Sequence, residues 1–163
     1  MGIIIMTLKV YTKNSCASSR KVVAKLKELG IEFKEQKVNH EFLDYDSFLD
    51  VLSLTDNGVD DIITTKAIAY GELVKNGVNI EELSITELYE LLKNNTSVFK
   101  TPLIHDNKKM MTGYNEFDIR MFLDKEKRML ERSKVLEMSN KEYSKNKHIY
   151  DELMLKEEQD NVI

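Results

Sequence analysis

Apolar and polar positions along the first third of the chain follow two different periods. Leu8, Val10 and Tyr11 form a short apolar run that ends in a polar turn, which is the pattern of a strand. Apolar residues then recur at helical spacing and stop at Gly30; they are Val22, Val23, Leu26 and Leu29. Residues 31–38 alternate again, so we expect a second strand there, parallel to the first because a helix connects the two.

The middle of the chain is predicted to be helical. Helical spacing recurs over residues 44–54 and 64–76, and an acidic, turn-rich loop centred on Gly58 separates the two stretches. A third helix is expected after Ser84, because Ser-Ile-Thr-Glu matches a capping box. Together these elements predict a helical insertion over about residues 44–95.

Two more strands follow this insertion. Residues 101–112 have the pattern of a β-hairpin with a polar turn at residues 107–108, and Pro102 opens its first strand, where a sheet tolerates proline. A last helix is expected from the apolar residues Phe117, Ile119, Phe122 and Leu123.

Composition changes abruptly after residue 124. About half of residues 125–161 are charged, and the stretch contains neither glycine nor proline. We expect a partly helical or disordered extension over 124–163, in which residues 130–137 prolong the last helix and residues 149–154 form a second, amphipathic helix. The folded domain is then expected over residues 6–123.

Composition also limits the classes of function. The chain has 163 residues, a net charge of −4 and one cysteine, so an internal disulfide is excluded and binding to DNA by bulk electrostatics is disfavoured. No apolar run is long enough to span a membrane, and the first residues lack the features of a signal peptide, whether the start is Met1 or Met6. We expect a cytoplasmic protein without a metal or other cofactor.

The single cysteine, Cys16, is expected where the first strand passes into the first helix. Unsatisfied N–H groups and the positive end of the helix dipole favour a thiolate or a bound anion there. A strand, a cysteine and a helix at the start of a small α/β domain resemble the thioredoxin-like arrangement. Such domains carry a cis-proline opposite the cysteine loop, so we expect a cis Thr101–Pro102 bond.

Five short segments, taken in order, are similar to the Spx branch of the arsenate reductase-like (ArsC) family. They are CASSRK at 16–21, LTDNG at 54–58, DDIITTK at 60–66, TPLI at 101–104 and GYNE at 113–116. The resemblance implies a thioredoxin-like α/β fold with a mixed four-stranded sheet, an inserted helical subdomain and here a charged helical tail. It also implies a Gram-positive transcriptional regulator that binds the C-terminal domain of the RNA polymerase α subunit under stress.

The resemblance further implies which residues act. Gly58 corresponds to the point of close approach to the polymerase domain, and Lys66 to a required basic residue. Arg20, beside Cys16, is expected either to lower the pKa of the thiol or to bind a carboxylate of the partner, and Asp61 is expected among the partner contacts. The redox switch of the family is a CxxC pair, but the second position here is Ser19. A hydroxyl can bond to the Cys16 thiolate but cannot form a disulfide, so we expect a regulator without this switch.

An enzyme remains the main alternative. Cys16 and Arg20 match the Cys-x-x-x-Arg pattern of arsenate reductases, and a glutaredoxin-like thiol activity is also open. The resemblance implies two further arginines that hold the oxyanion, but Thr101 and Tyr114 stand at those places and cannot supply a bidentate guanidinium.

A third alternative is an adaptor or competitor that occupies the polymerase without activating it. In the regulator interpretation, DNA is contacted only through the polymerase complex. Members of the family are removed by a Clp protease, directly or through an adaptor, by means of a C-terminal tag. Residues 161–163 do not match that tag.

Overall fold

The computed structural model describes residues 7–160, with side chains described up to residue 153. Residues 1–6 and 161–163, on which the expectations about the start and the degradation tag depend, lie outside the described residues. The chain divides into two compact units, one that ends at Phe122 and one that begins at Leu123. None of the described helices is both long and apolar enough to cross a membrane.

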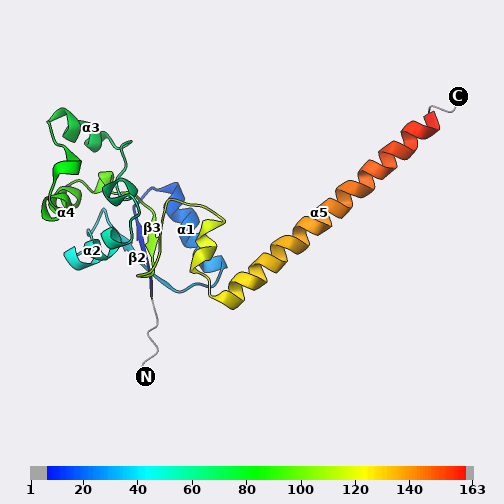
Figure 1. Cartoon of the computed structure of the whole chain (residues 1–163), viewed down its shortest axis with the longest axis horizontal. Coiled ribbons are helices and arrows are strands. Elements are labelled where there is room, and N and C mark those ends of the chain that lie inside the picture. Colours follow the sequence, from blue (N-terminus) through cyan, green and yellow to red (C-terminus); the bar gives the residue numbers. More distant parts are fainter. Residues whose placement is uncertain (1–6, 161–163) are drawn as a thin grey trace, which may run out of the picture. The chain divides into compact units, whose positions relative to one another are not determined.

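The first unit is built on a four-stranded mixed sheet with the strand order β2-β1-β3-β4 (Figure 1). The strands are β1 (Leu8–Thr12), β2 (Phe33–Lys37), β3 (Leu103–His105) and β4 (Met110–Thr112). β1 pairs in parallel with β2 and antiparallel with β3, and β3 pairs antiparallel with β4. The predicted α/β fold with a mixed four-stranded sheet is therefore confirmed.

Alternating side chains of the central strands are buried in two separate hydrophobic cores, one on each face of the sheet. Val10 of β1 and Ile104 of β3 pack on one side with α1 (Ala17–Glu28), which contributes Val22 and Leu26. The neighbouring positions Tyr11 and Leu103 belong to the other core, beneath the helical insertion. This period of two is what places α1 on one face of the sheet and the insertion on the other.

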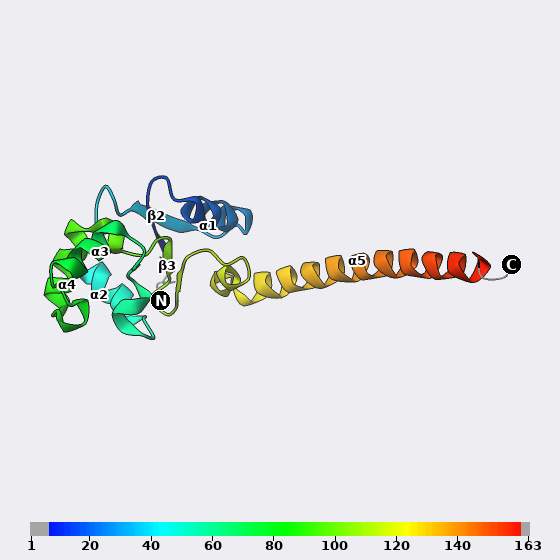
Figure 2. The same ribbon diagram turned by 90° about the horizontal axis from the view of Figure 1, so that it is seen from above.

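The insertion contains three α-helices that gather on the side away from α1 (Figure 2). They are α2 (Tyr45–Ser53), α3 (Ile68–Lys75) and α4 (Ile85–Asn94). The capping box at Ser84 is confirmed, since Ser84 and Glu87 bond reciprocally. α3 begins later than the prediction from residue 64, because the Thr64 N–H donates to the Val98 carbonyl at 2.8 Å beside the Ile63–Phe99 bridge.

The peptide bond between Thr101 and Pro102 is cis, as expected, directly before β3. The hairpin turn is also confirmed: Asn107 has a φ of 68°, and the Asp106 carboxylate accepts from the N–H groups of Lys108 and Lys109 at 3.1 Å each. The expected last helix of this unit is instead a short 3₁₀ helix, Asp118–Phe122.

The second unit is one long helix, α5 (Lys125–Asp160), rather than the two shorter pieces predicted. Asp124 caps it by accepting from the Lys127 N–H at 2.8 Å. No glycine or proline interrupts it, and ion pairs one turn apart support it, such as Lys141 with Glu137 at 2.9 Å. The apolar residues of the predicted second piece continue the same helix.

Candidate functional site

Cys16 is the N-cap of α1, at the carboxyl end of β1. β1 is buried over most of its length, and the chain leaves it through a tight turn in which Ser15 has a φ of 60°. Cys16 keeps an extended backbone, and its Sγ accepts a hydrogen bond from the Ser19 N–H at 3.4 Å. The thiol is partly exposed, so it satisfies a helix end and remains accessible.

The surroundings of Cys16 favour its thiolate. Burial alone would raise the pKa of this thiol. The Ser19 hydroxyl and the N–H groups of Ser19 and Ser18 act in the opposite direction, and the positive charge of Lys13 adds to them. The net result is a pKa below the ordinary value for cysteine, which is the direction expected at a helix N-terminus.

Ser19 occupies the position at which a second thiol would complete a CxxC pair. It is 3% exposed, and its Oγ meets no partner at hydrogen-bonding geometry among the described residues. The hydroxyl is therefore able to turn toward the Cys16 thiolate, since a serine O–H rotates to suit its acceptor. No other cysteine exists in the chain, so oxidation of Cys16 must involve a second molecule.

Lys13 lies in the cysteine loop, residues 13–16, and bonds this loop to the segment at 97–100 that precedes the cis-proline. Its Nζ donates to the Phe99 carbonyl at 2.5 Å and the Ser97 carbonyl at 3.3 Å. Burial lowers the pKa of Lys13, and the nearby Cys16 counteracts this. The contacts cross more than eighty residues of sequence, and nothing in the local pattern around Lys13 indicates them.

The Gly58 loop is held in shape by Asp61. Gly58 has a φ of +65°, and a Cβ placed on it would meet no atom within 4 Å. The Asp61 carboxylate accepts from the N–H groups of Asp56 and Asn57 at 2.8 and 2.9 Å, and from the Asn57 amide at 3.1 Å. The bonds from Asn57 lower the pKa of Asp61 more than any other contact. Asp61 thus organises the loop with both of its oxygens.

The Gly58 loop is anchored to the same central segment as the cysteine loop. The Lys100 Nζ donates to the Asp60 carbonyl at 2.7 Å, and the Lys100 N–H donates to the Ile62 carbonyl at 2.7 Å. Lys66 lies just beyond this contact; its side chain is exposed, and its N–H donates to the Thr64 hydroxyl at 3.4 Å. Sequence reasoning missed Lys13 and Lys100, because lysines at these places have no distinguishing local pattern.

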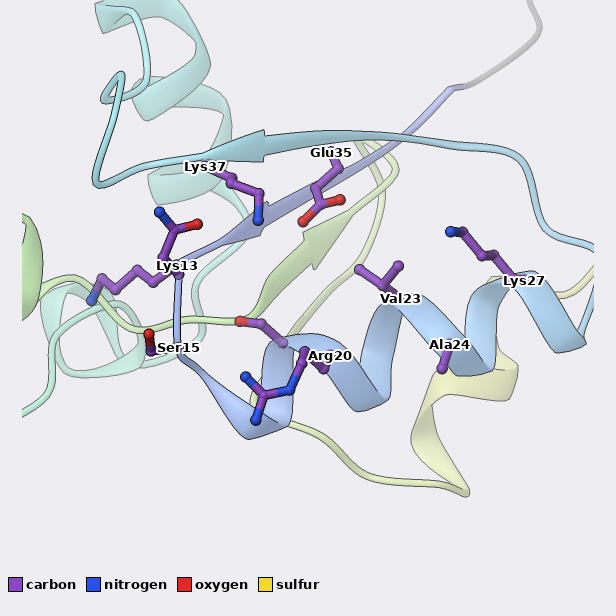
Figure 3. A pocket seen from close by; sticks show the side chains of 10 residues that line it. Lys13, Ser15, Arg20, Val23, Ala24, Lys27, Glu35 and Lys37 are labelled. Atoms are coloured by element: carbon purple, nitrogen blue, oxygen red, sulfur yellow. The ribbon is translucent and has the colours of Figure 1, made fainter.

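Arg20 is the fourth residue of α1, four positions after Cys16. It is exposed and lines a hollow of about 400 Å³ between β2 and α1, to which Cys16 does not contribute (Figure 3). The other charged residues that line this hollow are Lys13, Lys27, Lys37 and Glu35. Glu35 accepts a hydrogen bond from the Thr12 hydroxyl at 2.6 Å. The excess of cations suits an anionic group of a partner.

The two remaining positions of an oxyanion site carry no positive charge. Thr101 precedes the cis-proline, and Tyr114 follows Gly113, with the Lys21 Nζ 6.0 Å from the centre of the Tyr114 ring. The charge that acts on Cys16 comes from Lys13, whose amine already donates to two backbone carbonyls. Among the side chains described, no group of three or more His, Cys, Asp and Glu residues is arranged to hold a metal ion.

Comparison with known proteins defines the family. The sequence profile of the ArsC family matches residues 11–122, more than half of the chain. A "Global transcriptional regulator Spx" from Staphylococcus aureus strain N315 is 36% identical over 119 residues, which is 73% of this chain and 88% of the regulator. The "Global transcriptional regulator Spx" of Listeria innocua is 34% identical over 131 residues, which is 80% of this chain and 98% of the regulator.

The fold is also found among solved structures. An arsenate reductase from Vibrio cholerae superposes with a TM-score of 0.59 at 20% identity, covering 72% of this chain and 98% of the reductase. This likeness shows that the two proteins share a fold. From its sequence profile and its 34–36% identity to Spx regulators, this chain belongs to the ArsC family and is related to Spx.

Proposed function

We propose that this chain is a transcriptional regulator that binds the C-terminal domain of the RNA polymerase α subunit and modulates transcription under stress. It acts in the cytoplasm and reaches DNA only through the polymerase complex. The observation that carries this proposal is the identity to Spx regulators, 34–36% over nearly their whole length. The chemistry at Cys16 agrees with it, because no guanidinium stands at Thr101 or Tyr114 to complete an anion site.

The docking face in this proposal consists of the cysteine loop, the Gly58 loop and Lys66. The two loops each bond to the segment at 97–100, through Lys13 and Lys100 respectively. Because both loops bond to the same segment, their positions relative to each other are restricted before binding. This reduces the conformational entropy lost when a partner binds. Asp61 acts by shaping the Gly58 loop. Arg20 adds positive charge next to the cysteine loop, in the hollow between β2 and α1.

The test is binding of the purified chain to the isolated C-terminal domain of the α subunit, with Gly58→Arg measured beside it. The new side chain enters open space, so it should block a partner without a clash inside the fold. Its left-handed backbone costs about 1 kcal/mol for a residue other than glycine. Gly30→Arg is the matched control, because Gly30 has the same φ of +65° and the same open surroundings. Gly30 follows the C-terminal end of α1, whereas Cys16 lies at its N-terminal end.

We expect micromolar or tighter binding, at least a tenfold loss in Gly58→Arg, and unchanged binding in Gly30→Arg. Equal binding by both variants would disprove the role of the Gly58 loop, and no binding by the unaltered chain would disprove the function. A purified transcription assay then separates a regulator, which changes the output of responsive promoters, from an adaptor that only occupies the polymerase.

The lowered pKa of Cys16 favours a second candidate function, a thiol oxidoreductase of the arsenate reductase or glutaredoxin type. Cys16→Ser distinguishes the two. Under the regulator proposal this variant binds the polymerase domain as the unaltered chain does, and neither protein reduces arsenate or a glutathione mixed disulfide. Measurable reductase activity that disappears in Cys16→Ser would make the enzyme the correct assignment.

A further inference from the structure

The helix α5 lies outside the part of the chain that the ArsC profile matches, and it exposes a regular apolar stripe. Met129, Leu136, Tyr143 and Tyr150 follow one another at intervals of seven residues, and each is between 56% and 69% exposed. A seven-residue spacing nearly returns to the same side of an α-helix, so these four side chains form one line along it. Val135, Ile149 and Leu153 widen the line on one side.

A helix of this kind needs a partner surface. α5 has 36 residues and is therefore about 54 Å long. Most helical stability in proteins comes from the packing of an apolar face, and apolar residues at every seventh position occupy one of the two core positions of a coiled-coil heptad. The second core position, three residues after each stripe residue, holds Arg132, Ser139, Asn146 and Leu153, so the seam is narrow and micromolar association is the appropriate expectation.

The charges of α5 identify the partner. Residues 125–147 contain eight lysines and arginines against four acidic residues, whereas residues 148–160 contain one lysine against five acidic residues. The helix is thus basic over its first part and acidic at its end. A second copy in the antiparallel direction places each acidic end beside a basic stretch, whereas a parallel copy places like charges together.

We propose that α5 pairs with α5 of a second copy of this chain as an antiparallel coiled coil. The stripe from Met129 to Tyr150 forms the contact, and the opposite charges of the two ends select the direction. The pairing goes beyond the polymerase contact, because it uses a segment outside the docking face. A dimer carries two copies of that face.

The first experiment measures the mass of the full chain in solution by sedimentation equilibrium over a micromolar concentration range. We expect a monomer–dimer equilibrium for the unaltered chain. Leu136→Asp should raise the dissociation constant of the dimer at least tenfold. Met138→Asp is the control, because Met138 is 70% exposed two residues away on the opposite side of the helix. A monomer at all concentrations, or equal loss in both variants, would overturn the proposal.

The second experiment determines the direction. Chains with Cys16→Ser and either Ser133→Cys or Lys147→Cys, positions one helical turn from the stripe residues on each side of them, are mixed and treated with a short thiol-specific cross-linker. Antiparallel pairing predicts a predominant link between position 133 of one chain and 147 of the other. Links of each position to itself would instead show parallel pairing and refute the antiparallel arrangement.

Discussion

His105 is a single residue whose burial has a measurable consequence. Its ring is 0% exposed in β3 and stacks on Tyr11, with 5.8 Å between ring centres. Neither ring nitrogen has a hydrogen-bond partner among the described residues. Burial lowers the pKa of His105, and Lys9 adds to this, while Asp50 and Asp106 act in the opposite direction. The native protein therefore keeps this imidazole neutral.

The stability of the protein should consequently decrease in mild acid. The unfolded chain accepts a proton on His105 near its ordinary pKa of about 6.5, whereas the folded chain does so only at lower pH. The contribution of His105 to stability is then fully present above about pH 6.5 and decreases below it, by up to about 1.4 kcal/mol for each pH unit. Urea denaturation between about pH 5 and pH 8 measures this effect.

His105→Phe keeps a ring against Tyr11 and removes the titration, so its stability should depend less on pH over that range. His148→Gln is the control, because it removes an exposed histidine on α5 instead of the buried one. Identical pH dependence in His105→Phe and in the unaltered chain would show that another group is responsible.

The start of α4 shows how a local sequence defines an element. The Ser84 hydroxyl accepts from the Glu87 N–H at 3.3 Å, and the Glu87 carboxylate accepts from the Ser84 N–H at 2.8 Å. Two N–H groups of the helix end are thereby satisfied. The apolar side of α4, with Leu88 and Leu92, is buried in the core beneath the insertion.

Ser84→Ala should destabilise the protein by about 1 kcal/mol, the usual effect of losing an N-cap hydroxyl. The midpoint of urea denaturation should decrease with an unchanged slope. Glu90→Ala, at an exposed position in the middle of α4, serves as the control and should have a smaller effect. A midpoint for Ser84→Ala at or above that of Glu90→Ala would contradict the capping role.

At the scale of the whole first unit, Lys13 connects parts of the fold that lie far apart in the sequence. Its amine donates to the carbonyls of Ser97 and Phe99. Phe99 also forms an isolated β-bridge with Ile63, three residues before Lys66. The cysteine loop and the helical insertion are thus supported by one segment. A change at Lys13 should therefore alter both stability and the chemistry of Cys16.

Lys13→Met should destabilise the fold by about 2 kcal/mol, because it leaves two carbonyls without a charged donor. It should also raise the pKa of Cys16, since the positive charge of Lys13 helps to lower it. The rate of thiol alkylation as a function of pH measures this shift. Lys37→Met, which removes a lysine from the same hollow, should leave the alkylation profile unchanged. Equal profiles for both variants would exclude Lys13 as the source of the effect.

Much of the fold could be predicted because its signals are local. The strand before Cys16, the capping box at Ser84 and the turn at residues 107–108 depend on residues only a few positions apart, and the structure confirms each of them. The tail was only partly predictable. Its charged composition pointed to short helices or disorder. Because residues 125–160 contain no glycine or proline to break a helix, and Asp124 caps its start, the segment forms one continuous α5.

The sequence by itself determined the order of the elements, the position of Cys16 at a helix start and the lack of a second thiol. Only the tertiary structure decided how the candidate site is assembled. It places Arg20 in the lining of the hollow between β2 and α1, brings the positive charge of Lys13 near Cys16, and uses Asp61 to hold the Gly58 loop. The physical reason is that periodicity and caps act within a few residues, whereas the site depends on contacts between segments that meet only after the sheet has formed.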